Sequence, residues 1–151
     1  MRQCCDALPP NKPRYLMGVG YPVDLALGVA LGVDMFDCVF PTRTARFGTA
    51  FTSLGEIKLR NKNYAKDFGP LEEGCTCEAC TTFTRAYLHM IEKHDNFCHL
   101  LSMHNVNFLF TLMRRLRKAI QTETLPQFLK TFLNNISSQE KQIPDWVKYA
   151  L

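Results

Sequence analysis

The fold of this chain is decided by one stretch in its first third, Asp34-Met35-Phe36-Asp37-Cys38-Val39-Phe40-Pro41-Thr42-Arg43-Thr44-Ala45-Arg46-Phe47-Gly48. It begins as an apolar run interrupted by Asp34 and Asp37, and it ends in a predicted loop that carries Arg43 and Arg46. Pro41 lies between the two halves and ends any sheet pairing, because proline has no N–H to donate. We expect the apolar side chains of the run to be buried: Met35, Phe36, Cys38, Val39 and Phe40. An aspartate in such a strand, followed by a basic loop, indicates the active-site edge of an α/β protein.

Two predicted strands flank an apolar helix in this part of the chain. Residues 14–20 form the first strand, Pro22 starts a helix over 23–32, and residues 34–40 form the second strand. Strand, helix and strand in this order predict a βαβ unit with parallel strands. A parallel pair needs neighbours on its edges and helices over its faces. We therefore interpret this region as part of a larger α/β sheet or barrel, with further sequence expected before Met1.

The composition is that of a globular protein, with 46% hydrophobic and 21% charged residues in 151 and a net charge of +4. The charge is unevenly distributed. Between Arg43 and Lys66 there are six basic residues and one acid, whereas between Asp67 and Glu78 there are four acids and no base. A local basic segment suits a polyanion such as nucleic acid, and a solvated hairpin surface explains it equally well.

The cysteines point to a metal site. Their number, seven, is odd, and Met1-Arg2-Gln3 does not begin a signal-peptide pattern, so we expect a reducing, cytoplasmic compartment without a disulfide framework. Cys75, Cys77 and Cys80 place three thiols within six residues. Such a cluster in a reduced chain is typical of a metal site, and Zn is its usual occupant.

A fourth ligand is needed, and four histidines compete for the role. If residues 81–93 form a helix, His89 and His94 lie roughly 13 and 21 Å along it from Cys80. His99 and His104 follow a predicted turn at Asp95-Asn96, on a segment that can return towards the cysteines. Spacing alone does not choose between them, although His104 has more chain on which to return.

The remaining segments predict a hairpin and two helices. Residues 47–53 and 56–60 form a predicted β-hairpin, and residues 106–122 form an amphipathic helix. The basic side chains near the end of that helix complement its dipole, with phosphate contact as the alternative: Arg114, Arg115, Arg117 and Lys118. A last helix over 125–134 precedes a polar tail that contains Trp146.

These motifs together resemble the C-terminal part of tRNA-guanine transglycosylase, the queuine tRNA-ribosyltransferase family. The resemblance runs from about Arg14 to Thr131. It is carried by Met17-Gly18-Val19-Gly20, the stretch from Asp34 to Gly48, Cys75-x-Cys77-x-x-Cys80 and His104-Asn105. Within it, Phe40-Pro41-Thr42-Arg43-Thr44-Ala45-Arg46-Phe47-Gly48 resembles the eukaryotic catalytic subunit.

The resemblance implies an α/β fold, namely the C-terminal portion of a (β/α)8 TIM barrel with an inserted Zn-binding subdomain. The expected divisions are residues 1–46 for the last βαβ unit or units of the barrel, 47–104 for the hairpin and the Zn-binding subdomain, 105–136 for the closing barrel helix and the C-terminal helix, and 137–151 for the tail.

It also implies the chemistry. Asp37 would be the nucleophile that attacks C1′ of the wobble guanosine and holds the tRNA as a glycosyl ester, before queuine replaces guanine. The arginines would keep the pKa of Asp37 low and grip the anticodon loop, while Met17 and Gly18 would contact the base. The Zn ligands would be Cys75, Cys77, Cys80 and His104, in a closed structural site.

The implied partners are tRNA, the queuine or guanine base, and a second subunit, either a homologous non-catalytic one or an identical one. Phe83, Tyr87 and Phe97 could serve such an interface or could be core. A truncated, inactive isoform that binds Zn, tRNA or a partner is the alternative function. The expected location is the cytoplasm, and the alternative is peripheral attachment to the mitochondrial outer membrane.

Overall fold

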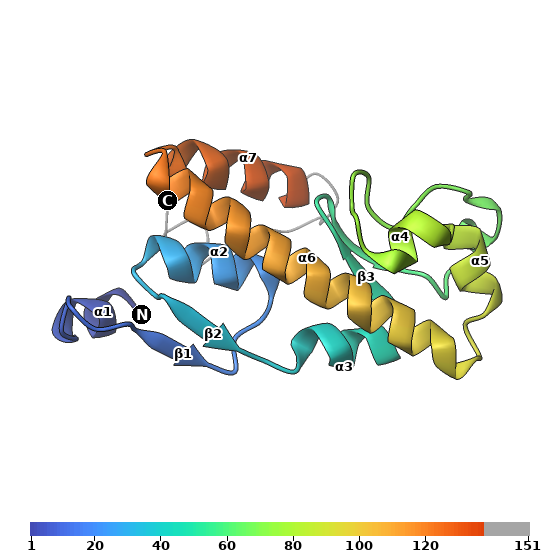
Figure 1. Cartoon of the computed structure of the whole chain (residues 1–151), viewed down its shortest axis with the longest axis horizontal. Coiled ribbons are helices and arrows are strands. Elements are labelled where there is room, and N and C mark those ends of the chain that lie inside the picture. The colour runs from blue at the N-terminus through green and yellow to red at the C-terminus, as the bar shows by residue number, and fades with distance from the viewer. Residues whose placement is uncertain (138–151) are drawn as a thin grey trace. The chain divides into compact units, whose positions relative to one another are not determined.

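The computed structural model describes residues 1–137, and the polar tail with Trp146 lies outside the described residues. The elements, in order, are α1 (Arg2–Ala7), β1 (Tyr15–Met17), α2 (Pro22–Ala30), β2 (Met35–Asp37), α3 (Phe40–Arg46), β3 (Thr49–Thr52), β4 (Gly55–Lys58), the 3-10 helix η1 (Lys62–Lys66), α4 (Glu78–Thr82), α5 (Arg85–Met90), α6 (Asp95–Gln121) and α7 (Leu125–Ser137) (Figure 1). They belong to two compact units. The first contains Met1–Phe40 and the chain from Leu112 onwards, and the second contains Pro41–Thr111.

The first unit contains the predicted βαβ arrangement. β1 and β2 pair in parallel, with Tyr15 opposite Met35, and Met17 opposite Asp37. α2 connects them and lies beside the pair (Figure 1). Pro22 opens α2 at a position where a missing N–H costs nothing, which is the start that the sequence predicted.

A helical layer forms the core of the first unit. The apolar side of α2 packs with α7 and with the last turns of α6. The buried members of this cluster are Val23, Ala26, Leu27, Leu112, Leu116, Leu129, Phe132, Leu133 and Ile136. α7 continues to Ser137, so the predicted last helix is present and slightly longer than expected.

The expected burial of the whole run around β2 is wrong. Met35 and Val39 are 46% and 68% exposed, while Phe36, Cys38 and Phe40 are half-buried. Successive side chains of a strand point to opposite faces, and in the described residues only the α2 side of this pair is covered. Phe36 lies close to Gly28 of α2, whereas Met35 faces away. Both strands are also shorter than predicted, at three residues each.

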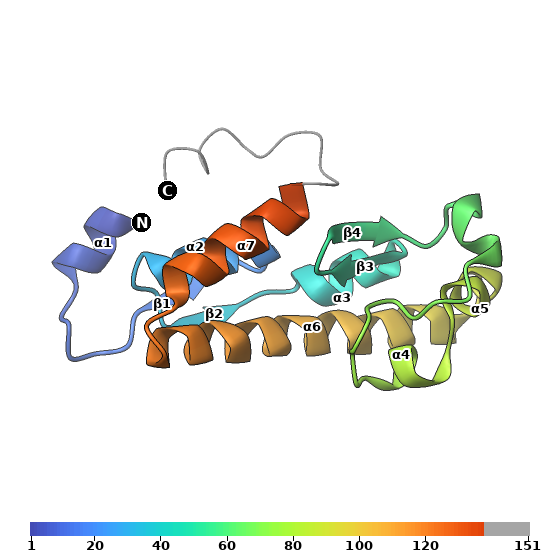
Figure 2. The ribbon, with the colours of Figure 1, turned by 90° about the horizontal axis from the view of Figure 1, so that it is seen from above.

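The second unit begins with a correction, because the segment predicted as a basic loop is the helix α3. Pro41 lies in its first turn, where proline is tolerated, and it is buried together with Ala45. α3 leads into the predicted hairpin, in which β3 and β4 pair antiparallel (Figure 2). All four residues of β3 are buried. The core here consists of Ala45, Ala50, Ile57, Leu59, Leu71, Ala79, Leu88, Phe97, Leu100 and Leu101.

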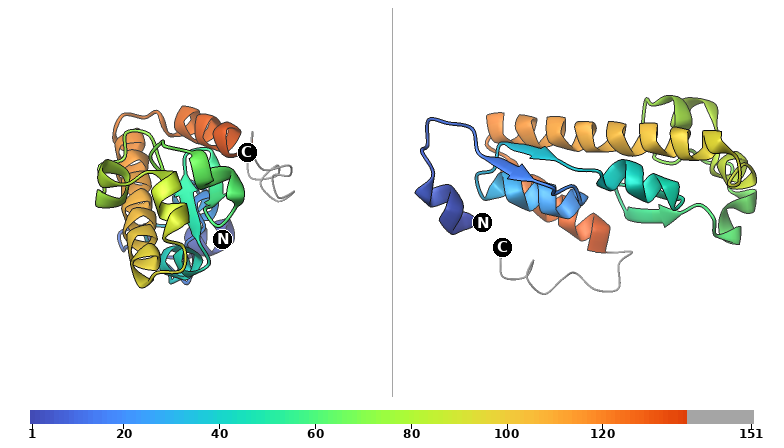
Figure 3. Two further views of the ribbon diagram at one scale, coloured as in Figure 1. Left: turned by 90° about the vertical axis from the view of Figure 1, so that its right-hand side faces the viewer. Right: turned by 90° about the horizontal axis from the view of Figure 1, so that it is seen from below.

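The helices that follow also differ from the prediction. Residues 81–93 were expected to be one helix, but α4 ends at Thr82 and α5 begins after Thr84. The Thr84 hydroxyl accepts a hydrogen bond from the Tyr87 N–H at 3.1 Å, and this N-cap explains the break. Asp95 was expected in a turn, yet it opens α6, an unbroken helix of 27 residues (Figure 3). No helix within residues 1–137 combines the length and the apolar character needed to cross a membrane.

Candidate active site and metal centre

Asp37 lies at the C-terminal end of β2, and its carboxylate is held by two donors from the β1 segment. The Gly18 N–H donates to Asp37 Oδ1 at 3.1 Å, and the Tyr15 hydroxyl donates to the same carboxylate. Gly18 has a φ of +74°, a conformation that glycine adopts without strain. The side of Gly18 that a Cβ would occupy is open space. Asp37 is therefore oriented by hydrogen bonds while remaining exposed to solvent.

The charge on Asp37 is stabilised by its own strand pair. The hydrogen bond from Tyr15 and then that from Gly18 hold the pKa of the Asp37 carboxyl below its usual range. The same bond raises the pKa of Tyr15. The expected contribution of Arg43 and Arg46 to this shift stays a prediction, since both arginines belong to the second unit. At neutral pH the exposed Asp37 is an anion, which is the form a nucleophile needs.

Arg43 and Arg46 occupy the last turn of α3 and are exposed. Their spacing of three residues places them on neighbouring positions of the helix surface. The Arg60 guanidinium donates to the Arg46 carbonyl at 3.4 Å, which brings a third cation to this part of the second unit. These side chains can contact phosphates, and as cations at a helix C-terminus they also complement its dipole.

The four predicted metal ligands lie together. The Sγ atoms of Cys75, Cys77 and Cys80 are 3.8, 3.5 and 3.3 Å from His104 Nδ1. All four potential ligand atoms lie within 4.8 Å of one another. In a tetrahedral zinc site, Zn–S and Zn–N bonds of about 2.3 and 2.0 Å place sulfur and nitrogen roughly 3.5 Å apart. The donor set and its spacing therefore fit zinc.

His104 is fully buried, and its tautomer is set by a hydrogen bond on the far side of the ring. Its Nε2 lies 2.8 Å from the Phe51 carbonyl, so Nε2 carries the proton and Nδ1 faces the thiols with a free lone pair. Burial lowers the pKa of His104 and raises the pKa of the Cys77 and Cys80 thiols. The thiols thus keep their protons until a cation displaces them.

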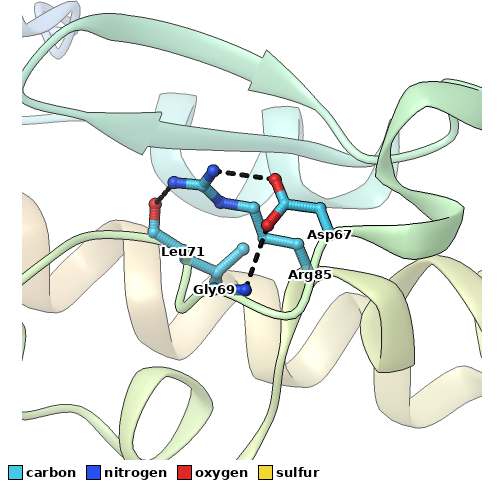
Figure 4. Close-up of polar contacts among 4 residues, drawn as sticks. All are labelled: Asp67, Gly69, Leu71 and Arg85. Carbon is cyan, nitrogen blue, oxygen red and sulfur yellow. Dashed lines mark hydrogen bonds and ion pairs between the residues drawn. The ribbon is translucent and has the colours of Figure 1, made fainter.

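The loop that carries the cysteines is closed at its base by an ion pair (Figure 4). Arg85 Nη1 lies 3.0 Å from Asp67 Oδ2, and Arg85 Nη2 donates to the Leu71 carbonyl at 3.1 Å. The Gly69 N–H donates to Asp67 Oδ1 at 3.0 Å, and the Ala86 N–H donates to the Asp67 carbonyl at 2.7 Å. These bonds join the segment before the cysteines, at Asp67 and Leu71, to the segment after them, at Arg85 and Ala86.

The residue after His104 connects a second set of elements. The Asn105 side chain is fully buried and accepts the Phe51 N–H at 3.0 Å. Its amide donates to the carbonyls of Pro41 and Thr49, at 2.9 and 3.0 Å. Neighbouring residues of α6 thus serve different purposes, because His104 completes the metal cluster and Asn105 fixes the start of α3 to β3.

A model of the queuine tRNA-ribosyltransferase family matches residues 1–138. The chain belongs to the queuine tRNA-ribosyltransferase family. It is 47% identical to the queuine tRNA-ribosyltransferase catalytic subunit of Caenorhabditis elegans, over 98% of this chain and 41% of that protein. The Schizosaccharomyces pombe catalytic subunit is 48% identical over 98% of this chain and 39% of its own length.

The similarity extends to bacteria. The queuine tRNA-ribosyltransferase of Dictyoglomus turgidum is 49% identical over 89% of this chain and 35% of its own length. The chain therefore spans between 35% and 41% of these three relatives. The Cys3His cluster fits the zinc site of queuine tRNA-ribosyltransferases.

The structure also decides questions that the sequence left open. His104 joins the cysteines, whereas His89 Nδ1 lies 2.7 Å from the Leu59 carbonyl, and His94 and His99 are exposed. Phe97 is core, and Phe83 stacks on Tyr87 with ring centroids 4.8 Å apart.

Two contacts were missed by sequence analysis. Sequence analysis did not link Tyr15 to Asp37. The available signal was its position two residues before Met17, which places both side chains on the same face of β1. Asn107 donates to Cys75 Sγ at 3.4 Å, and its signal would have been its position one helical turn after His104.

Proposed function

We propose that this chain carries the nucleophile and the metal centre of a tRNA-guanine transglycosylase, as part of a queuine tRNA-ribosyltransferase catalytic subunit. The observation that carries the proposal is the exposed Asp37 carboxylate at the C-terminal end of a parallel strand pair, ionised by Tyr15 and Gly18. Active sites of parallel α/β proteins lie at this end of the strands. The similarity to catalytic subunits supports the same assignment.

In the proposed reaction, an Asp37 oxygen attacks C1′ of the wobble guanosine. The bond from C1′ to the base breaks, its electron pair leaves with guanine, and an ester forms between Asp37 and the ribose. The departing guanine takes up a proton at the nitrogen that held C1′. Queuine then attacks C1′ and loses the proton of its attacking nitrogen, which forms the new glycosidic bond and releases Asp37 as a carboxylate. Two displacements at one carbon give net retention of configuration. The donors from Tyr15 and Gly18 keep Asp37 anionic before attack and after release.

Met17 and Gly18 are proposed as the base contact. The Met17 side chain is 73% exposed, and the surface beside Gly18 is open, so a flat base can approach both. Arg43 and Arg46 are proposed to contact phosphates of the anticodon loop, since both are exposed and neither forms an ion pair within residues 1–137.

Cys75, Cys77, Cys80 and His104 are proposed to hold zinc in a closed structural site. A bound zinc ion supplies a cross-link there between the cysteine loop and α6, without a position for catalytic water. We further propose that the chain forms the C-terminal portion of a (β/α)8 barrel with an inserted zinc subdomain. The proposed enzyme is cytoplasmic and pairs with a second subunit, either a homologous non-catalytic one or an identical one.

The decisive experiment uses a chimaera in which residues 1–138 replace the matching part of the Caenorhabditis elegans catalytic subunit. The chimaera is incubated with labelled tRNA and guanine, and covalent adducts are resolved on a denaturing gel. We expect an adduct that disappears in Asp37→Asn. The control is Asp34→Asn, whose side-chain oxygen can still accept the Arg14 N–H, and it should retain the adduct. An undiminished adduct in Asp37→Asn refutes the nucleophile assignment.

The second candidate is a form that keeps the metal centre and the tRNA contacts without turnover. Within residues 1–137 the β1–β2 sheet has only two strands, and its Met17 and Met35 face lacks a cover. A base contact without a facing wall within the described residues favours binding over catalysis, so we expect no base exchange by residues 1–151 alone. Exchange of radiolabelled guanine into tRNA by this chain would exclude the second candidate.

A further inference from the structure

The Cys75 sulfur of the metal cluster receives a hydrogen bond from a side-chain amide. The donor is Asn107, whose Nδ2 lies 3.4 Å from Cys75 Sγ. The main-chain N–H of Cys80 is used differently, because it donates to the Cys77 carbonyl at 3.0 Å, and the Cys77 side chain accepts no capping hydrogen bond at the start of α4. The contact to Cys75 therefore depends on a side chain and not on the path of the main chain.

Asn107 reaches the cluster from α6. It follows His104 by three residues, so both side chains lie on the same face of the helix. Cys75 is also the cysteine whose sulfur lies farthest from His104 Nδ1, at 3.8 Å against 3.5 and 3.3 Å for Cys77 and Cys80. The amide therefore connects to α6 the ligand that His104 holds least closely.

We propose that Asn107 is a positioning residue of the metal centre, whose amide N–H orients the Cys75 sulfur and withdraws negative charge from it. The inference rests on the proposed zinc site. Three thiolates, one neutral imidazole and one dication carry a net charge of −1, and an N–H donor spreads that charge. A sulfur with less charge attacks electrophiles more slowly and is released less readily. Mutation of groups that hold metal ligands in this way commonly lowers the affinity for the metal by about 10–100-fold.

The test uses the full chain loaded with zinc and three variants at this position. Asn107→Leu keeps the size and removes the donor, Asn107→Asp replaces the donor by an acceptor with negative charge, and Asn107→Gln keeps an amide. The control is Asn96→Leu, the same change at an exposed position of α6. Iodoacetamide is added to each zinc-loaded protein, and mass spectrometry gives the alkylation rate at each cysteine.

We expect Asn107→Leu to raise the alkylation rate of Cys75 at least ~3-fold and to weaken zinc binding about 10-fold in competition with a chromophoric chelator. Rates at Cys77 and Cys80 should change less, because the Asn107 amide donates to the Cys75 sulfur. The alkylation rate of Cys75 should be higher in Asn107→Asp than in Asn107→Leu. In Asn107→Gln the rate should lie between those of Asn107→Leu and the unaltered chain. Asn96→Leu should have the rate of the unaltered chain. A purely structural role for Asn107 would not confine the change to Cys75.

The outcomes separate the two proposals. An unaltered chain that fails to bind one zinc ion per molecule refutes the proposed metal centre. The role of Asn107 alone is refuted if the unaltered chain binds one zinc ion and Cys75 reacts at the same rate in the unaltered chain, Asn107→Leu and Asn107→Asp. Should Asn107→Leu fail to fold, the remaining two variants still test the proposal, because the alkylation rate of Cys75 should be clearly higher in Asn107→Asp than in Asn107→Gln.

Discussion

The two candidate sites differ in how they are enclosed. At the metal centre, His104 is fully buried, the Cys75 sulfur accepts a hydrogen bond from Asn107, and the loop that carries the cysteines is closed by Asp67 and Arg85. At the strand ends, Asp37 is exposed, and so is Met17 beside it. The first arrangement holds its groups by packing, and the second holds one carboxylate by two hydrogen bonds. Stability should therefore respond strongly to changes at the metal centre, and chemistry should respond to changes around Asp37.

The largest effect is expected for Cys80→Ser. It removes one of four ligands from a cluster whose thiols are half-buried, and coupled metal binding and folding is worth several kcal/mol in small zinc domains. We expect loss of stoichiometric zinc and loss of protected amides in residues 41–111, measured by metal analysis and hydrogen exchange. Asp37→Asn is the matched control and should keep its zinc. If Cys80→Ser keeps zinc and the same protection, the closed site does not stabilise this unit.

Asn105→Ala should be the next most damaging change. It leaves the Phe51 N–H and the carbonyls of Pro41 and Thr49 without their partner in a buried position. A loss of about 2–4 kcal/mol in unfolding free energy is expected from urea titration of the zinc-loaded chain. Asn96→Ala, at an exposed position of the same helix, should cost less than ~0.5 kcal/mol. A similar loss in both variants would argue against the connecting role of Asn105.

Arg85→Met should have a moderate effect that depends on pH. The side chains of Arg85 and Asp67 are 26% and 31% exposed, so after allowance for solvent screening we expect a loss of about 1 kcal/mol at pH 7. The bond from the Gly69 N–H, followed by Arg85, holds the pKa of Asp67 below its usual range against its partial burial.

The sign of that dependence follows from the lowered pKa. A carboxyl whose pKa is lower in the folded state stabilises it above the unfolded pKa, and this contribution is lost as the pH falls through the folded value. The difference between Arg85→Met and the unaltered chain should shrink below pH ~4. Lys66→Met removes a neighbouring exposed cation and should show no such dependence. A difference that is constant down to low pH would exclude Asp67 as the partner that matters.

The smallest effect on stability, and the sharpest test of the open site, is expected for Tyr15→Phe. Tyr15 is the largest cause of the lowered pKa of Asp37, so its removal should move that pKa upward towards the ordinary aspartate value, with Gly18 retaining part of the shift. Carbon-13 NMR of the carboxyl group measures the change directly. Tyr64→Phe in the second unit is the control. An unchanged titration of Asp37 would show that Gly18 suffices to hold the carboxylate.

The sequence predicted what depends on local chemistry. The βαβ order, the hairpin and the cysteine cluster were predicted because their periodicity or spacing leaves few alternatives, and the structure confirms all three. The break between α4 and α5 could not be predicted, because it depends on one hydrogen bond to the Thr84 hydroxyl. α3 was missed because Pro41 forbids a strand and permits a first helical turn equally well.

The choice of His104 and the role of Tyr15 depend on contacts between segments distant in sequence. His104 is 24 residues from Cys80, and only the continuous path of α6 places its Nδ1 against the sulfurs. The donor to Asp37 comes from the paired strand, so it could be found only once the register of Tyr15 and Met17 against Met35 and Asp37 was known.

The adjacency of His104 and Asn105 on α6 has a consequence for how this segment tolerates change. Each residue added to a helix before them rotates both side chains by about 100°, since a turn takes 3.6 residues. A single inserted residue between Phe97 and His104 would therefore turn the imidazole away from the sulfurs and the amide away from Phe51 in the same step. The spacing of this segment is therefore fixed tightly, and its exposed positions should accept substitutions where the segment does not accept insertions or deletions.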